Sequence, residues 1–428
     1  MKRADGGKSS RQLAVRWALS RHARRLLTLA LAGLLLAMLS GRPEFAGVAA
    51  PALLLLAPRR YAHNERLRVT VAATAIRLFE GETVALDVRV EGHGENSVEL
   101  RLRTAEPVVP GEGAQRSIGP HARLAFTVQR WGRWPIGSLR IILRDRWHMY
   151  EGRAELWLRR VDTYPAAAAQ RTRVILGRLP DRLGEHPART PGPGTEFAAV
   201  RPYVLGDPQR RINWPATTRR GRLQLNTFAA ERAQDVIIVV DGMNDVGPPG
   251  SSSLDVAIRG AAGAAKAYLA VRDRVGFISF GGGLHWLTPG LGDRQFYRIV
   301  EAVLGSAGVW SAAGWSPSAQ VERLPRSALP PGALVIAFSP LLHHRFIEAI
   351  RELRERGFPV LIVNVLNHEP GAGAGSLGRL ARRIWRMEQQ AVSFSLHELG
   401  IPVVHWDGES SLDLPLAPYT RHRLAVGR

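Results

Sequence analysis

The sequence DVIIVVD at residues 235–241 decides the fold of the C-terminal half of the chain. Its unbroken run of branched apolar residues predicts a strand that is buried on both faces, as in a parallel sheet. Further apolar runs predict strands, and the longer segments between them predict helices, the first with Ser253 as its N-cap. The expected strands are 274–280, 284–288, 333–338, 359–365 and 402–406, and the expected helices are 253–272, 293–304, 345–356 and 377–399. This alternation predicts a doubly wound, Rossmann-like α/β domain over residues 234–415.

The carboxyl ends of these strands are where such a sheet binds ligands. Asp241 ends the first strand, and Asp245 follows in the next turn. A hard cation such as Mg²⁺ prefers several oxygen ligands, of which two carboxylates supply a part. We therefore expect an oxygen-rich, exposed surface around Asp241 and Asp245.

Residues 66–164 change to a period-two pattern, clearest at 83–90 and 98–103. Glycine and proline turns separate these runs about every ten residues, which is typical of a small antiparallel sandwich. We expect a β-rich, sandwich-like domain over residues 66–164.

Residues 165–233 have little periodicity and are rich in Pro, Gly and Arg, so we expect a connector and not a domain. Unpaired buried charges are costly, so Glu196 and Asp207 are expected to pair with nearby arginines. The alternative is that this segment binds a partner. Its candidate partner-binding residues are Glu196, Arg201, Tyr203, Asp207, Arg211, Trp214 and Arg219.

The N-terminal sequence predicts a membrane anchor. Residues 1–25 form a basic leader, and residues 26–40 and 45–58 are two uncharged apolar runs. Each run would form about 22 Å of helix, shorter than the roughly 30 Å hydrocarbon core, which favours a tight helical hairpin over 26–58 and not one straight span. Basic residues on both flanks place these flanks in the cytoplasm. A signal peptide and a buried soluble helix are the alternatives.

Composition and motifs exclude several classes of protein. The chain has 428 residues and a net charge of +21, but only three lysines, and its arginines are spread along the chain up to a basic tail at 416–428. We therefore expect no nucleic-acid partner. Without cysteine, disulfides and thiolate metal sites are impossible. The sequence also lacks G-x-S-x-G and H-E-x-x-H, and its G-x-G-x-x-G at 373–378 does not directly follow a strand.

The connector motifs resemble a known family. Glu-Phe at 196–197, Arg-x-Tyr at 201–203, Gly-Asp at 206–207 and Arg-Ile-Asn-Trp at 211–214, before a buried strand that ends in Asp, are similar to the bacterial domain-of-unknown-function-58 membrane proteins. This resemblance implies an anchor or adaptor that works with MoxR-type AAA+ ATPases, without enzymatic activity.

The last domain resembles a von Willebrand factor A domain, whose metal-ion-dependent adhesion site uses an Asp-x-Ser-x-Ser loop, a later Thr and a later Asp. Here Asp241 matches the first Asp, but Met243 and Asp245 stand at the two serine positions. Ser316 stands for the Thr and Ser339 for the last Asp. A thioether is a poor ligand for a hard cation, so the resemblance implies a degenerate site, with Asp241, Asp245 and Ser316 as its candidate ligands and Mg²⁺ as its cation. The alternative is a loop that is closed by hydrogen bonds and binds no metal.

Together these features predict an α+β multidomain protein of the bacterial inner membrane. We expect a multi-pass anchor with cytoplasmic soluble domains, and a non-enzymatic adaptor whose partners are the lipid bilayer and a MoxR-type AAA+ ATPase. The alternative hypothesis is a metal-dependent enzyme at the strand ends of the α/β domain.

Overall fold

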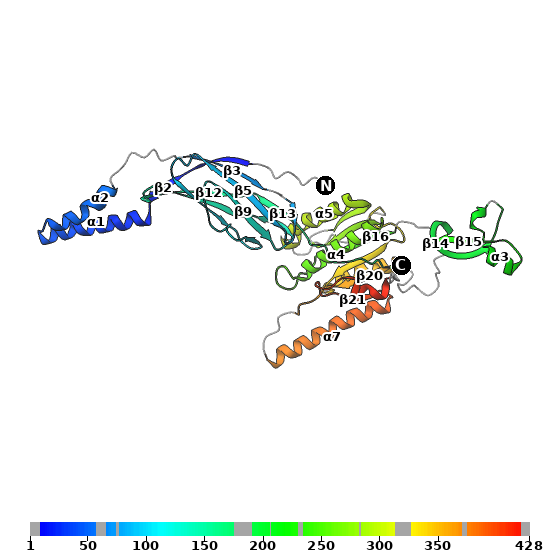
Figure 1. The fold of residues 1–428 in the computed structure, drawn as a ribbon. Helices are drawn as coiled ribbons and strands as arrows, with labels where there is room; N and C mark the ends of the chain where they lie inside the picture. Colours follow the sequence, from blue (N-terminus) through cyan, green and yellow to red (C-terminus); the bar gives the residue numbers. More distant parts are fainter. Residues whose placement is uncertain are drawn as a thin grey trace. The chain divides into compact units, whose positions relative to one another are not determined.

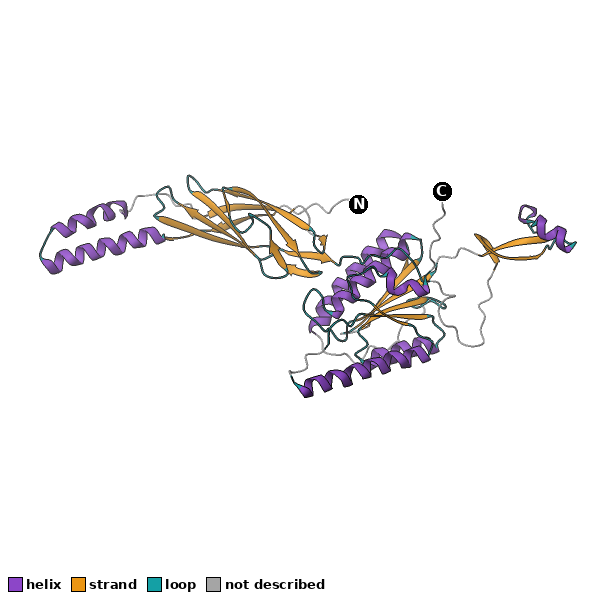
Figure 2. Ribbon diagram, turned by 60° about the horizontal axis from the view of Figure 1, so that its bottom comes forward, coloured by secondary structure: helices purple, strands orange, loops and turns teal. Residues whose placement is uncertain are grey.

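The structure is a computed structural model that describes residues 9–56, 66–73, 77–174, 191–205, 207–229, 234–281, 284–312, 327–369 and 375–420. It divides into two compact units, Met1–Ala166 and Ala167–Arg428. The mixed α/β class with several sheets is confirmed (Figure 1; Figure 2).

The first unit contains two five-stranded antiparallel sheets that share one apolar core. Alternate residues along the strands are buried, as in β5, where Val84, Leu86, Val88 and Val90 face the core. One sheet has the order β1 (Ser9–Ala14), β3 (Arg66–Ala73), β5 (Thr83–Glu91), β9 (His121–Val128) and β7 (Val108–Pro110). The other has the order β2 (Arg16–Leu19), β12 (Tyr150–Trp157), β11 (Ser138–Arg144), β6 (Ser97–Arg103) and β8 (Ser117–Ile118). A small third sheet contains β10 (Gly132–Pro135), β13 (Arg160–Tyr164) and β4 (Arg77–Phe79).

Residues 9–19 differ from the simple basic leader that we expected. They add one edge strand to each large sheet: β1 pairs with β3 and β2 pairs with β12. The physical reason is an apolar alternation, Leu13, Val15, Trp17 and Leu19, that is hidden among arginines. Val15 is buried in the shared core, and Leu13 and Trp17 pack against it.

Two helices follow β2. Helix α1 (Arg21–Ser40) begins at Ser20, whose hydroxyl accepts a hydrogen bond from the Ala23 N–H at 3.0 Å. It has 20 residues, or about 30 Å, because it begins before the uncharged run that we had counted. Among the described residues, α1 is the one helix that is both long enough and apolar enough to cross a membrane. Helix α2 (Glu44–Leu56) packs against it, with Ala30 and Ala49 fully buried between them.

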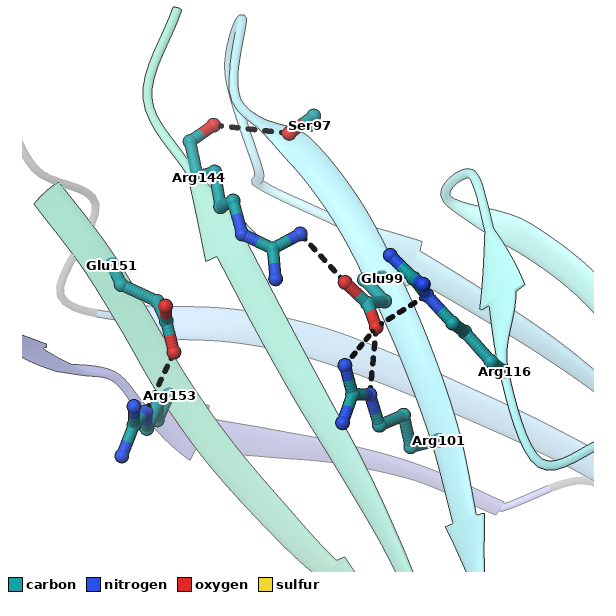
Figure 3. Close-up of polar contacts among 7 residues, drawn as sticks. All are labelled: Ser97, Glu99, Arg101, Arg116, Arg144, Glu151 and Arg153. Carbon is teal, nitrogen blue, oxygen red and sulfur yellow. Dashed lines mark hydrogen bonds and ion pairs between the residues drawn. The ribbon is translucent and has the colours of Figure 1, made fainter. Parts of the chain in front are cut away.

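A buried carboxylate joins two strands of the second large sheet and the residue that precedes a third (Figure 3). Glu99 of β6 accepts from Arg101 at 2.6 Å and from Arg144 of β11 at 2.6 Å, and pairs with Arg116 beside β8 at 2.9 Å. Burial alone would raise the pKa of Glu99, but the hydrogen bonds and charges of Arg144 and Arg101 hold this pKa below its ordinary value. Glu99 therefore stays ionised and braces the sheet.

The second unit is built on a six-stranded sheet that is parallel except for the edge strand β18. Helices pack on both of its faces (Figure 2): α4 covers β16 and β19 on one, and α6 and α7 add to the core on the other. The strand order is β18 (Leu284–Gly290), β17 (Arg274–Phe280), β16 (Asp235–Asp241), β19 (Leu334–Ser339), β20 (Val360–Asn364) and β21 (Val403–His405). The helices are α4 (Ser253–Ala270), α5 (Gly292–Ala312), α6 (His344–Glu355), α7 (Ser376–Glu398) and α8 (Asp413–Leu416), followed by the 3₁₀ turn η4 (Ala417–Tyr419).

The expected connector contains more regular structure than its sequence predicts. Strand β14 (Pro191–Pro202) pairs with β15 (Gln224–Ala229), and the chain between them forms the turn η2 (Gln209–Arg211) and helix α3 (Trp214–Arg220). The pairing contains register shifts, which removes the regular alternation that identifies strands. We refer to the described residues of 200–226 as the motif module.

Candidate functional site

Asp241 lies where the sequence places it, at the carboxyl end of β16, but it is completely buried. Its Oδ2 accepts a hydrogen bond from the Ser339 hydroxyl at 2.6 Å, and its Oδ1 accepts from the Met243 N–H at 3.0 Å. Burial raises the pKa of Asp241 to about 6, although both hydrogen bonds act in the opposite direction. The expectation that Asp241 contributes to an exposed surface is therefore wrong: the ends of the flanking strands, Phe280 and Ser339, are buried with it.

Ser339 closes this site from the neighbouring strand β19. Its side chain is fully buried, and its oxygen also accepts the Leu341 N–H at 2.9 Å. The residue that replaces the last Asp of an adhesion-type site thus hydrogen-bonds the first Asp directly and fixes the turn after its own strand.

Asp245 stabilises the N-terminus of α4. Its Oδ1 accepts the Leu254 N–H at 3.0 Å and the Ser253 hydroxyl at 3.4 Å, both in the first turn of α4. A carboxylate at this place satisfies free helix N–H groups and the positive end of the helix dipole. The N-cap itself is Ser252, one residue before our prediction, in a capping box with Asp255. Asp245 is thus engaged in holding the loop to α4.

The described residues do not fit a Mg²⁺ site. Such a site needs near-octahedral oxygen ligands, whereas both Asp241 oxygens are hydrogen-bonded, Asp245 holds α4, and the Met243 side chain packs against the apolar core. Within the ranges that the structure describes, no group of three His, Asp or Glu side chains could hold a metal. Ser316, the third candidate ligand, lies outside the described residues.

The motif module is braced by an ion pair. Arg201, at the end of β14, donates two hydrogen bonds of 2.7 Å to the two oxygens of Asp207. Asp207 also accepts the Val204 N–H at 2.9 Å. The hydrogen bond from Arg201 lowers the pKa of Asp207, and the same bond raises the pKa of Arg201. This is the expected pairing of Asp207 with a nearby arginine.

Asn213 connects the two halves of the module. Its Oδ1 caps α3 by accepting the Ala216 N–H at 3.0 Å, and its amide donates to Asn226 Oδ1 at 2.7 Å. The Thr217 hydroxyl accepts the Gln224 N–H at 3.0 Å. These bonds tie α3 to β15, so the turn between the strands has a defined conformation.

The braced module leaves large apolar side chains in solvent. Leu205 is 97% exposed, and Val204, Trp214 and Leu223 are also exposed. Arg219 is exposed, while Tyr203 and Arg211 are half-buried. The side chain of Glu196 lies outside the described part of β14. The structure therefore brings Arg201 and Asp207 together and leaves Trp214 and Arg219 facing outward.

Sequence reasoning missed Asn213 and Leu205. Asn213 stands between Ile212 and Trp214 in a motif that we read for its charges and aromatics, although an Asn before a short helix is a recognisable capping signal. Leu205 is one leucine in a loop, and nothing in the pattern reveals its exposure.

Comparison with known proteins gives one family match. No curated protein and no solved structure matches the chain. The family model described as "Protein of unknown function DUF58" matches residues 199–371, which include the motif module and the first strands of the α/β domain.

Proposed function

We propose that this chain is a membrane-anchored, non-enzymatic adaptor that binds a partner through its motif module. The partner class is a MoxR-type AAA+ ATPase, acting in the assembly or maturation of other complexes, as the resemblance implies. One observation carries the proposal: the module is held rigid by Arg201, Asp207 and Asn213, yet it exposes Leu205 and Trp214 to solvent. Rigid, exposed apolar and aromatic groups are typical anchors of protein interfaces.

The strand ends of the α/β domain give no support to the alternative, a metal-dependent enzyme at this place. Asp241 is buried and satisfied by Ser339, and Asp245 holds the start of α4. Neither carboxylate is free to act on a substrate. The domain would be von Willebrand factor A-like, with a degenerate adhesion-type site, and its mostly parallel sheet covered by helices on both faces is in keeping with this assignment.

The strand pairing of the first unit supports a two-pass anchor. Strand β1 precedes α1 and strand β3 follows α2, yet the two are hydrogen-bonded neighbours, with Leu13 opposite Leu67. One crossing would place these strands on opposite sides of the membrane. Two crossings keep both strands on the same side, and we propose that α1 and α2 cross as a hairpin.

The side chains of α1 suit a bilayer. Leu29, Leu35, Met38 and Leu39 are exposed, a surface that water would not favour. Close packing with α2 is possible because Gly33 has no side chain: a Cβ there would lie 3.3 Å from the Phe45 carbonyl oxygen. Small residues allow such approach between membrane helices.

The same pairing argues against a cleaved signal peptide, because cleavage within or after α1 would remove β1 and β2 from both sheets. The basic residues of the first turn of α1 favour the cytoplasm for the β domain, by the positive-inside rule. We place the protein in the bacterial inner membrane with its folded units in the cytoplasm.

A binding experiment tests the adaptor function. The full chain in mild detergent is titrated with the purified MoxR-type ATPase of the same bacterium. We expect Leu205→Glu to weaken binding on the order of tenfold or more, because it puts a charge into an apolar contact. Leu414→Glu is the matched control, an exposed leucine of α8 outside the module, and should leave binding unchanged. No binding by the wild type, or equal effects of the two variants, would refute the proposal.

A further inference from the structure

Helix α7 carries a long apolar surface that its own domain does not cover. Of its 23 residues only Gly378 and Leu396 are buried. Five large apolar side chains are between 49% and 81% exposed, namely Leu377, Leu380, Ile384, Met387 and Phe394. Such a surface in water calls for a partner.

The exposed side chains follow a seven-residue repeat. With Ala391 included, their positions 377, 380, 384, 387, 391 and 394 alternate steps of three and four, which are the a and d positions of a coiled coil. One β-branched residue, Ile384, stands at a central a position, and Leu380 stands at the d position before it. This combination is favourable for two parallel strands.

A second stripe of α7 serves its own domain. Trp385, Val392 and Leu396 occupy b and f positions and are half-buried or buried, with Val392 and Leu396 packed in the core. In Figure 1, α7 lies along the side of the α/β domain. The a and d stripe lies more than a quarter turn of the helix from this contact. At its C-terminal end, Phe394 also lines a groove of its own domain beside His405. The helix is already folded by its inner stripe, so a second helix would not need to nucleate it.

The charges beside the stripe match those of a second copy. Arg383 stands at a g position and Glu388 at the e position five residues later. In a parallel pair of identical helices, a g residue lies beside the e residue of the next heptad of the partner. An antiparallel pair would instead bring like charges together. Across the described ranges, neither Arg383 nor Glu388 has another hydrogen bond or ion pair, so both are available.

We propose that α7 joins two copies of this chain as a parallel, two-stranded coiled coil, with Arg383 of each copy paired to Glu388 of the other. The two-fold axis runs along the helices. Parallel helices in a two-fold dimer are compatible with two chains anchored in one membrane, but the dimer does not depend on the anchor or on the adaptor function.

Disulfide cross-linking tests the contact, because the chain has no native cysteine. Ile384→Cys at the central a position is compared with Arg379→Cys, which is exposed on the same helix but at a c position. The full chain is oxidised in detergent and in membranes. We expect rapid dimer formation by Ile384→Cys and little by Arg379→Cys. Equal, slow cross-linking of both would overturn the proposal.

Charge reversal tests the register. We expect Arg383→Glu and Glu388→Arg, each in the Ile384→Cys background, to slow cross-linking on the order of three- to tenfold, since each dimer loses two pairs. The double reversal should restore the cross-linking rate. It would not do so if the two residues only stabilised the helix within one chain. A double variant that is as slow as the single ones would overturn the register.

A lipid surface is the competing occupant, because Arg379, Arg382 and Arg383 lie near the stripe. Binding of α7 to lipid would give a blue shift of an environment-sensitive dye attached to Ile384→Cys when phosphatidylglycerol vesicles are added, and Ile384→Cys would not cross-link. That outcome would overturn the dimer.

Discussion

Asp241 and Ser339 form a short hydrogen bond between two strand ends. Burial has the largest effect on the pKa of the Asp241 carboxyl group. Among the residues that the structure describes, the carboxylate accepts hydrogen bonds from a hydroxyl and a backbone N–H and from no cation. Its ionised form is therefore less stable than in water, which is why burial raises its pKa.

This contact predicts a pH dependence of stability. The pKa of Asp241 is 3.8 in an ordinary environment and about 6 in the folded protein. The folded state thus holds a proton that the unfolded state loses, and the resulting stability is present below the ordinary pKa and lost as the pH rises through about 6. The loss is at most about 3 kcal/mol.

Urea unfolding of the full chain in detergent, between about pH 4 and pH 7, checks this prediction. Asp241→Asn cannot ionise, so its unfolding free energy should decline less over this range than that of the wild type. Parallel pH profiles of the two proteins would contradict the assigned environment.

The position of Asp241 could be predicted from the sequence, because a buried strand that ends in a carboxylate is a local pattern. The residue that hydrogen-bonds Asp241 could not be predicted in this way. Ser339 is 98 residues away, and the choice between an open ligand site and a closed hydrogen bond depends on how two strand ends meet. Asp207 is the opposite case: its pairing with Arg201, only six residues away, could be predicted from the local density of charge.

Among the elements, the Glu99 cluster makes a cross-strand brace whose energy can be measured. The Glu99 side chain is only 2% exposed and serves three guanidiniums, whereas Glu151 of the same sheet serves the single, exposed Arg153 at 2.8 Å. Figure 3 shows the two arrangements side by side.

We expect Glu99→Gln to lower the unfolding free energy by about 2–4 kcal/mol, since it removes the buried charge that accepts hydrogen bonds from Arg101 and the partly buried Arg144. Glu151→Gln, the matched control, should cost less than about 1 kcal/mol, because an exposed pair contributes little. Denaturant unfolding of the full chain checks both values. A Glu99 variant no less stable than the control would contradict the brace.

Strands with a regular alternation, such as β5 and β6, could be predicted from sequence, and so could the buried strand β16. Residues 9–19 were harder, because their four alternating apolar residues lie in a segment dominated by arginine. The β14–β15 pair was hidden for a different reason: its register shifts break the period of two. Local periodicity identifies elements only where the pairing is regular.

At the scale of the whole molecule, the pairing of β1 with β3 connects the fold to the membrane. It places residues before α1 and residues after α2 in one domain, whatever the length of either apolar run. Sequence reasoning reached a hairpin from run lengths and flanking charges, and the strand pairing supports this hypothesis by an independent argument. The proposed adaptor function in the cytoplasm requires that the folded units share one side of the bilayer.

Cysteine labelling in intact cells tests this arrangement most directly, because the cysteine-free chain gives each introduced thiol an unambiguous signal. Arg42→Cys lies in the turn between α1 and α2, Ser10→Cys lies in β1, and Leu205→Cys lies in the motif module. We predict that a membrane-impermeant maleimide, given access to the outer face of the inner membrane, labels Arg42→Cys at once. Ser10→Cys and Leu205→Cys should react only after the inner membrane is permeabilised. Labelling of Leu205→Cys before permeabilisation, or protection of Arg42→Cys until then, would contradict the account.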